Sequence, residues 1–289
     1  EAQYIRLFKR LRQYLRDGID DGSFRPVEPT ATTRALLGSV DWVFSWLHKI
    51  PADQVNEAAS QAVDILTHGL YAGKTEYPTS AVDPVESSDF PLEGFNREQQ
   101  NRLKQDAFYK TGTWLFNRQG FDGTSLDEIA EQLNVSKGAF YYHIRNKEDL
   151  LYNCYSRSLD ILENIYQQAR DSDARGLEKV EQTFHRIFYF QNSNEGPLIR
   201  YNSITALPME RRLEILKRTD ANNECFGNFL REGMTDGSVR EVNPFVAQNL
   251  IAGAVNASME LNLWRKVDDV DAAAIDYFDI FLNGLVKRS

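Results

Sequence analysis

Apolar residues recur at three- and four-residue spacing along most of the chain, a pattern that predicts a succession of amphipathic helices. Near the start, for example, Ile5, Phe8 and Leu15 stand among arginines and lysines. No stretch alternates apolar and polar residues with the period of two that a strand requires, so we expect an all-α fold. After an opening helix that ends before a turn at Asp21, helices are expected at residues 33–49, 53–71, 96–118, 126–133, 137–143, 147–171, 176–192, 198–207, 208–233, 243–265 and 268–287.

Residues 120–151 carry the most specific local signals, and they predict two short helices joined by a tight turn. Ser125 is a good N-cap, and Glu128 completes a capping box with it. Asn134 then interrupts the apolar stripe, and Ser136 caps the second helix. A short helix that begins with small residues and ends with polar aromatic ones suits the DNA major groove, which is about 12 Å wide. The competing interpretation is an ordinary three-helix cap with surface tyrosines.

The stretch SLDEIAEQLNVSKGAFYYHIRNKEDLL, which begins at Ser125, resembles the DNA-binding domain of the TetR family of bacterial transcriptional regulators. The resemblance implies a helix-turn-helix domain followed by a helical domain that binds an effector and dimerises. It also implies phosphate contacts from Thr124, Ser125 and Lys147. Lys147 opposes the dipole at the start of its helix, so we expect it to serve an external anion. Ala139 stands where the family often has threonine, which puts one hydrogen bond to DNA in doubt. The expected DNA-binding residues are Thr124, Ser125, Ser136, Lys137, Gly138, Ala139, Tyr141, Tyr142, His143 and Lys147.

The chain contains an internal repeat with a shift of 215 residues. LRDGIDDGSFRPVEP, which starts at Leu15, matches LREGMTDGSVREVNP, which starts at Leu230. The match continues without a gap as far as Gly69 in the first copy and Gly284 in the second. Because glycines, apolar positions and a turn all coincide, chance is a poor explanation.

The second copy is the C-terminal part of the TetR-like unit, so we expect the first copy to be the same part of another unit. This predicts a tandem of two TetR-like units, of which the first lacks its DNA-binding half within these 289 residues. A natural protein that kept only the dimerisation helices is the alternative. The predicted divisions are residues 1–71 for the first regulatory copy, 72–95 for a linker rich in proline and acidic residues, 96–149 for the DNA-binding domain and 150–289 for the effector-binding and dimerisation domain.

In the TetR-like pattern, the last two helices of each protomer form a four-helix bundle with those of a partner. Residues 31–71 and 243–287 of this chain can pair in the same way, as an intramolecular pseudo-dimer. A homodimer is expected if the tandem interpretation fails. Trp42 aligns with Ala257, so a bulky residue of one copy can face small residues of the other. Ordinary core packing without a pairing preference is the competing explanation.

The net charge of −9 argues against a protein that coats DNA. The segment from Asn96 to Leu150 is neutral, with eight basic and eight acidic residues, and the rest of the chain is acidic. This distribution fits a domain that binds selected DNA sequences. The two cysteines lack metal-ligand spacing, and neither a secretory signal nor a membrane-length apolar run is visible. We therefore expect a cytoplasmic protein with no membrane partner and no cofactor. The resemblance implies a bacterial protein that is associated with the nucleoid when bound.

The resemblance implies that residues 175–235 enclose an effector cavity, and the aromatic residues with polar tips there, with Met259 from the next helix, are typical of a small-molecule site. Core packing is the alternative for each of them singly. The four histidines show no spacing with serine, cysteine or carboxylates that indicates catalysis or metal binding, so we do not expect an enzyme. The expected effector-pocket residues are His185, Phe188, Tyr189, Tyr201, Phe226 and Met259.

The function expected from these observations is a ligand-responsive transcriptional regulator. It is expected to act as a repressor that a small molecule releases from double-stranded operator DNA. The sequence does not indicate which small molecule this effector is. A sensor or protein-interaction module that no longer reads DNA is the alternative.

Overall fold

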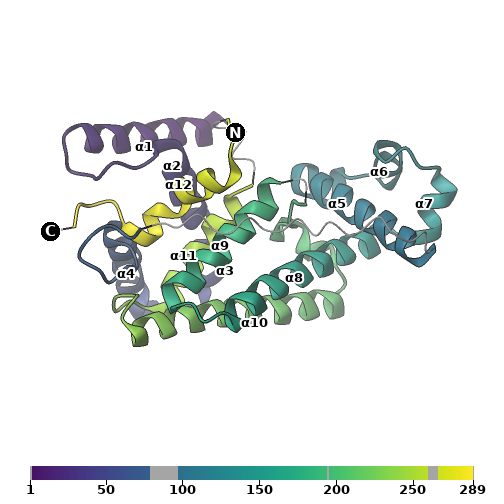
Figure 1. The fold of residues 1–289 in the computed structure, drawn as a ribbon. Helices are drawn as coiled ribbons and strands as arrows, with labels where there is room; N and C mark the ends of the chain where they lie inside the picture. The colour runs from purple at the N-terminus through teal and green to yellow at the C-terminus, as the bar shows by residue number, and fades with distance from the viewer. Residues whose placement is uncertain (1, 79–96, 194, 260–265, 289) are drawn as a thin grey trace. The chain divides into compact units, whose positions relative to one another are not determined.

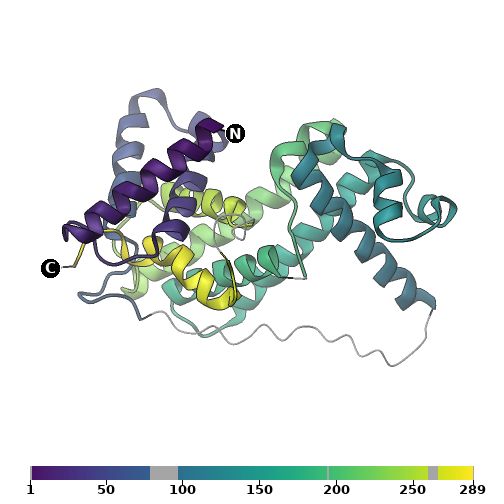
Figure 2. The same cartoon turned by 90° about the horizontal axis from the view of Figure 1, so that it is seen from above.

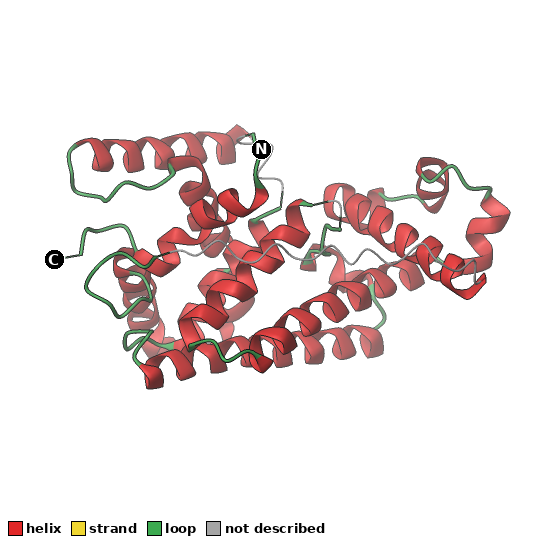
Figure 3. Cartoon of the chain, viewed as in Figure 1, coloured by secondary structure: helices red, strands yellow, loops and turns green. Residues whose placement is uncertain are grey.

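The computed structural model describes residues 2–78, 97–193, 195–259 and 266–288. Helices joined by turns make up these ranges, with one isolated antiparallel bridge between Tyr71 and Val239 (Figure 3). The predicted all-α fold is confirmed. Within the described ranges, no helix combines the length and the apolar character that crossing a membrane requires. The predicted N-cap Asn96 and residues 79–95 of the predicted linker lie outside the described residues.

The chain divides into two compact units. The helix-turn-helix unit comprises residues 84–165 and 193–222. The paired-copy unit comprises residues 1–83, 166–192 and 223–289. These units do not follow the boundary predicted at residue 150, because the long helices α8 and α10 each contribute residues to both.

The helix-turn-helix unit is built around an apolar core to which each of its main helices contributes. Phe116 comes from α5, Ile129 from α6, Phe140 from α7 and Leu151 from α8, and each is fully buried. The helix predicted to end at Arg118 reaches a break at Gly120, whose φ of 72° is non-helical and favours glycine, and a last turn follows to Gly123. The elements of this unit are α5 (Arg97–Gly123), α6 (Leu126–Gln132), α7 (Lys137–His143), the start of α8 (Lys147–Asp171), η3 (Tyr201–Ala206) and the first part of α10 (Met209–Asp236).

The paired-copy unit brings the two copies of the repeat together, and they lie side by side in both views (Figure 1, Figure 2). Its first copy holds α1 (Ala2–Asp20), α2 (Pro29–Asp41), α3 (Val43–Trp46), η1 (Leu47–Lys49), η2 (Ala52–Gln54) and α4 (Val55–His68). Its second copy holds α11 (Pro244–Ala257), α12 (Val270–Asn283) and the end of α10, and α9 (Gly176–Asn192) packs on α12.

The helix predicted over residues 33–49 is corrected in two places. It begins earlier, at Pro29, because the Glu28 carboxylate accepts a hydrogen bond of 2.6 Å from Ala31 N and caps the first turn. It is interrupted at Trp42, the C-cap of α2. The helix predicted over residues 243–265 likewise ends at Ala257, which is the residue that matches Trp42 in the repeat.

Helices α2 and α11 touch at two glycines. A Cβ added to Gly253 would lie 2.6 Å from Gly38 O and 2.5 Å from Trp42 Cβ. A Cβ added to Gly38 would lie 2.9 Å from Gly253 O and would also clash with Ala257 Cβ. Because Gly38 matches Gly253 and Trp42 matches Ala257, the two halves of this contact are related by the repeat. The expected placement of Trp42 against a small residue is therefore found, with Gly253 as that residue.

Arg25 of the first copy reaches the last turn of α12. Its Nε donates to Gly284 O at 2.6 Å, its guanidinium pairs with the Asp279 carboxylate, and its backbone N–H donates to Leu285 O at 2.9 Å. Only 3% of Arg25 is exposed, so this ion pair is sheltered from water.

Arg240 of the second copy makes the equivalent contacts with the last turn of α4. Its Nε donates to Gly69 O at 2.6 Å, its guanidinium pairs with Asp64 at 2.7 Å, and its backbone N–H donates to Leu70 O at 2.9 Å. Although burial alone would raise the pKa of Asp64, hydrogen bonding and charge from Arg240 lower it overall. The two arginines thus hold the copies together through the same set of contacts, made once in each direction.

Candidate DNA-binding surface

The first short helix of the candidate surface begins where the sequence predicts. Ser125 has extended backbone angles, and its hydroxyl accepts a hydrogen bond of 3.2 Å from Asp127 N, which makes it the N-cap of α6. The Glu128 carboxylate does not follow the capping-box prediction, since it accepts a hydrogen bond from Gln119 Nε2 at 3.1 Å. Asn134 ends the helix with a φ of 54°, and the resulting turn leads into α7.

Helix α7 spans Lys137–His143, the predicted bounds, and the Ser136 hydroxyl caps it by accepting a hydrogen bond of 3.3 Å from Ala139 N. One residue of the helix, Phe140, is fully buried and anchors it to the core by an edge contact with Phe108. The remaining residues turn away from the core. A Cβ added to Gly138 would meet no atom within 4 Å, so this part of the helix offers an unobstructed approach.

The exposed side of α7 carries the polar groups that the sequence predicts for DNA contact. Tyr142 is 82% exposed, Tyr141 is 47% exposed, and His143 is half-buried with its ring against Phe108. Phenolic hydroxyl and imidazole groups can donate hydrogen bonds to phosphate oxygens or base edges. The structure therefore brings Ser136, Lys137, Gly138, Ala139, Tyr141 and Tyr142 onto one accessible helix.

Lys137 makes an exposed ion pair that the sequence analysis missed. Its Nζ lies 2.6 Å from Asp127 of α6, and the hydrogen bond and charge of that carboxylate raise the pKa of Lys137. Exposed pairs of this kind are weak and exchange readily with other partners. The ammonium can therefore exchange Asp127 for another anionic partner.

Two residues that are predicted to contact phosphate, Thr124 and Lys147, have hydrogen-bond partners within the protein. The Thr124 side chain is buried, and its hydroxyl donates to Gly120 O at 2.8 Å instead of facing outward. Lys147 donates to Phe121 O at 2.8 Å and to Thr124 O at 3.1 Å, with its ammonium 4.4 Å from the centre of the Phe121 ring. The charge of Lys147 thus satisfies carbonyl groups at the end of α5, which explains a cation in the first turn of α8 without an external anion.

Comparison with protein families separates the two parts of the chain. Residues 109–153 match the model described as bacterial regulatory proteins of the tetR family. Residues 3–70 match the model described as the tetracyclin repressor-like C-terminal domain. The chain belongs to the TetR family. Within this family the match to a C-terminal domain falls on the first copy of the repeat, ahead of the helix-turn-helix.

The TetC protein of transposon Tn10 from Escherichia coli is 29% identical over 129 residues, which cover 41% of this chain and 65% of TetC. The chain thus spans less than two thirds of the length of this relative. The structure of the ketosteroid transcriptional regulator KstR2 of Mycobacterium tuberculosis matches 64% of this chain and 95% of its own, with a TM-score of 0.54 and 20% identity. The structure of AibR with isovaleryl coenzyme A and operator DNA matches 63% and 99%, with a TM-score of 0.50 and 22% identity. At these identities the two structures establish the fold.

Most of the predicted effector residues lie inside the paired-copy unit. His185, Phe188, Phe226 and Met259 are buried, and Tyr189 is half-buried. His185, Phe188 and Phe226 adjoin an aromatic cluster in which the rings of Phe184 and Phe278 stack with centroids 4.4 Å apart. Burial lowers the pKa of His185 to about 4, so its ring is neutral at pH 7. Within the described residues His185 Nε2 has no hydrogen-bond partner, which leaves a buried polar atom among aromatic rings.

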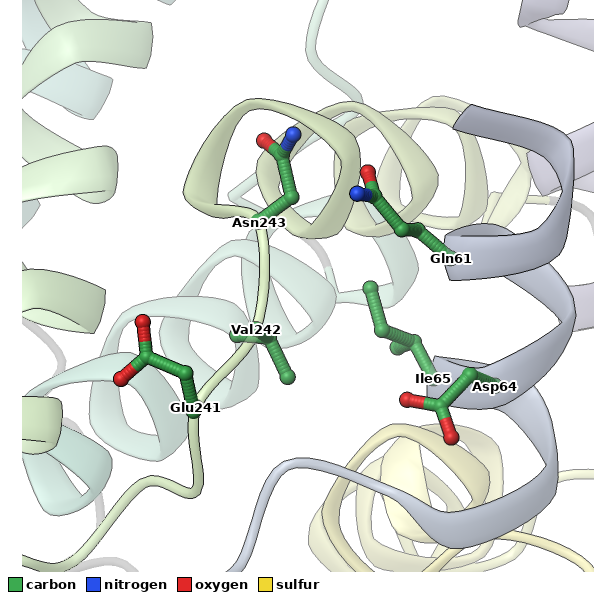
Figure 4. A pocket seen from close by; sticks show the side chains of 6 residues that line it. All are labelled: Gln61, Asp64, Ile65, Glu241, Val242 and Asn243. Atoms are coloured by element: carbon green, nitrogen blue, oxygen red, sulfur yellow. The ribbon is translucent and has the colours of Figure 1, made fainter. Parts of the chain in front are cut away.

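Tyr201, the remaining predicted effector residue, belongs to the helix-turn-helix unit, where its hydroxyl lies 2.5 Å from Thr219 Oγ1. The paired-copy unit contains a pocket that is lined by residues other than those predicted to contact an effector (Figure 4). Two carboxylates, Asp64 and Glu241, stand on opposite sides of it, and none of the six predicted effector residues lines it. The predicted effector site stays a prediction. The residues around this pocket are Gln61, Asp64, Ile65, Glu241, Val242 and Asn243.

Proposed function

We propose that this TetR-family chain is a ligand-responsive regulator that reads operator DNA through α7 and acts as a repressor. The observation that carries the proposal is the accessible side of α7. Its N-terminal turn is unobstructed, its single apolar anchor faces inward, and Lys137, Tyr141 and Tyr142 face outward. A helix of this kind in the second position of a helix-turn-helix is the one that enters the major groove. The expected contacts of Ser125, Ser136 and His143 belong to the same proposal.

We also propose that the two copies of the repeat form the equivalent of a TetR dimer interface within one chain. The reciprocal contacts of Arg25 and Arg240, and those of Gly38 and Gly253, support this proposal. In an isologous interface, residue i of one side contacts residue j of the other and the reverse also holds. The contacts in this chain follow that rule after the shift of 215 residues. The match of residues 3–70 to a TetR-type C-terminal domain supports the tandem reading.

An effector that alters the position of α8 would move α7, because α8 follows directly on the helix-turn-helix. One of the two structural relatives is a ketosteroid transcriptional regulator, and the other is bound to isovaleryl coenzyme A and operator DNA. We infer a predominantly apolar effector for this chain, since His185, Phe188, Phe226 and Met259 offer aromatic and apolar surface with few polar groups. The neutral ring of His185 would supply a hydrogen bond to such a ligand. Tyr189 and Tyr201 remain further candidates for ligand contact.

Residues 1–289 contain a single match to the TetR-type DNA-binding domain. Paired recognition helices in TetR-like dimers need half-sites about 34–36 Å apart. A single DNA-binding domain therefore occupies one half-site. We therefore expect this chain to protect an asymmetric, half-site-sized stretch of DNA. The family and the exposed recognition helix together support the inference that the protein is a regulator and not an enzyme.

The proposal is tested by selecting DNA that binds the 289-residue chain from a random library and measuring affinity by fluorescence anisotropy. Lys137→Ala and Tyr142→Ala are expected to weaken binding to the selected DNA by tenfold or more, because each removes an exposed donor from α7. Lys266→Ala is the matched control, since its side chain is 84% exposed and lies in the other unit. Far-ultraviolet circular dichroism checks that each variant is folded.

The alternative function is a sensor or interaction module whose helix-turn-helix does not read DNA. Failure to select any DNA sequence, or affinities that Lys137→Ala and Tyr142→Ala leave at the wild-type value, would favour this alternative. The aromatic cluster would then be the functional centre, and binding of an apolar ligand would persist without any effect on DNA.

A further inference from the structure

Two residues of the first copy are exposed at positions that are buried in the second. Phe44 is 78% exposed, whereas its counterpart Met259 is 4% exposed. Val63 is 63% exposed, whereas its counterpart Phe278 is fully buried. Phe278 is covered by α9, whose Phe184 ring stacks on it. The difference arises because the second copy has α9 on this face and the described part of the first copy has no helix there.

A third position on α1 repeats this pattern and adds a charge. Tyr14 is 52% exposed, and its counterpart Phe229 is 1% exposed. In the second copy, Lys179 of α9 lies 5.9 Å from the centre of the Phe229 ring and 3.0 Å from the carboxylate of Glu232. The counterpart of Glu232 is Asp17, which stands exposed one turn after Tyr14. The first copy therefore keeps both the ring and the carboxylate that a lysine in an α9-like helix would contact.

In the second copy, the turn after α10 holds the start of α9. Asp236 accepts a hydrogen bond of 2.8 Å from Gly176 N, and Ser238 Oγ accepts one of 3.1 Å from Leu177 N. These bonds satisfy two of the backbone N–H groups that a helix N-terminus leaves without intrahelical partners. Asp236 also accepts a bond of 2.8 Å from Ser238 N, which shapes the turn.

The same turn is present in the first copy. Asp21 accepts a hydrogen bond of 2.8 Å from Ser23 N, and the glycine between them has a positive φ of 81°, as Gly237 has at 76°. Asp21 and Ser23 are both exposed. The first copy thus retains a formed acceptor pair for the first turn of a helix at the position where α9 begins in the second copy.

These positions follow the course of α9 from end to end. Its first turn lies at Asp236, Ser238 and Phe229, and its middle lies at Phe278. Its last residue, Asn192, donates to Ser258 O beside Met259. Their counterparts define what we call the open face of the first copy. The open face consists of Tyr14, Asp17, Asp21, Ser23, Phe44 and Val63.

We propose that the open face is the seat of a second α9-like helix, the counterpart of α9 in the first unit of the tandem. The inference rests on the proposed tandem and names the partner of its first copy. The seated helix carries aromatic or large aliphatic residues one turn apart toward Phe44 and Val63. It carries a lysine toward Asp17, and its first N–H groups meet Asp21 and Ser23.

The test uses a synthetic peptide of residues 175–192, labelled with a fluorophore at its C-terminus, as the probe for the 289-residue chain. Fluorescence anisotropy is expected to show saturable binding. Val63→Asp and Phe44→Asp are expected to weaken it at least about tenfold, because a carboxylate would be buried against an apolar helix. Asp21→Ala is expected to weaken it a few-fold by removing the cap. Leu213→Asp, at a position that is 57% exposed in the other unit, is the control and is expected to leave peptide binding unchanged.

Two outcomes would overturn the proposal. One is an absence of peptide binding, or binding that the Val63→Asp and Phe44→Asp variants leave unchanged. The other is a dimer of the chain, seen by sedimentation, that Val63→Asp dissociates, since the occupant would then be a second copy. Binding of the selected DNA by the same variants separates this proposal from the function of α7. Loss of peptide binding with wild-type DNA affinity concerns only the open face, and failure of DNA binding concerns only α7.

Discussion

Gly253→Ala tests the close approach of α2 and α11. Alanine is the better helix former by about 1 kcal/mol, so the substitution would stabilise α11 in isolation. In the folded chain the added Cβ would lie 2.5 Å from Trp42 Cβ and 2.6 Å from Gly38 O. Both atoms are fixed to the backbone of α2, so the clash is relieved only when the two helices separate.

Overpacking of a close-packed interior typically costs roughly 1–3 kcal/mol, and a clash with backbone rather than with a flexible side chain lies toward the upper end. After the gain in helix propensity is subtracted, we expect Gly253→Ala to lower the free energy of unfolding by about 2 kcal/mol. Gly38→Ala meets the reciprocal contact and is expected to cost a similar amount. Because one separation of the helices relieves both clashes, the double variant should lose less than the sum of the single losses.

The assay is urea denaturation followed by far-ultraviolet circular dichroism. Gly138→Ala is the matched control, since its Cβ would meet no atom within 4 Å, and it is expected to leave stability unchanged or to raise it by up to about 1 kcal/mol. A Gly253→Ala variant as stable as the wild type would refute the reasoning. So would additive losses in the double variant, because they would mean that the two glycines do not share one contact.

Two further predictions concern ionisable groups of the paired-copy unit. Arg25→Ala is expected to cost about 3 kcal/mol and Arg240→Ala about 1 kcal/mol of unfolding free energy, because the side chain of Arg25 is 4% exposed and that of Arg240 is 25% exposed; equal losses in urea denaturation would contradict this. The pKa of His185 is lowered to about 4 from 6.5, so unfolding takes up a proton between these values and stability falls as the pH drops through this range. His185→Gln is expected to reduce the loss of stability between pH 7 and pH 5 by about 2 kcal/mol, and an unchanged pH dependence would show that His185 is not buried as a neutral ring.

The helix-turn-helix was predictable because its signals are local. Ser125 and Ser136 cap their helices where the sequence indicates, and the bounds of α7 are those predicted. Hydroxyl groups one residue before an apolar stripe leave few alternatives. The repeat was equally informative, since it showed which residues of the two copies are equivalent; the contacts of Arg25 and Arg240 lie outside the segments predicted to pair.

Partners set by burial were not predictable in the same way. The residue type of Thr124 and Lys147 suggested phosphate contacts, but tertiary packing gives both side chains carbonyl partners within the protein. The breaks after α2 and α11 at Trp42 and Ala257 carry no glycine or proline, so no local signal marks them. Aromatic residues such as Phe188 look alike in sequence whether they fill a core or line a ligand cavity.

We propose that one chain supplies both sides of a TetR-type dimer interface. Sedimentation equilibrium of the 289-residue chain tests it most directly. We expect a particle with the mass of one chain, 33.2 kDa, at micromolar concentration. A particle of twice that mass that persists on dilution, and that separates into single chains when Gly38 and Gly253 are both replaced by alanine, would contradict it.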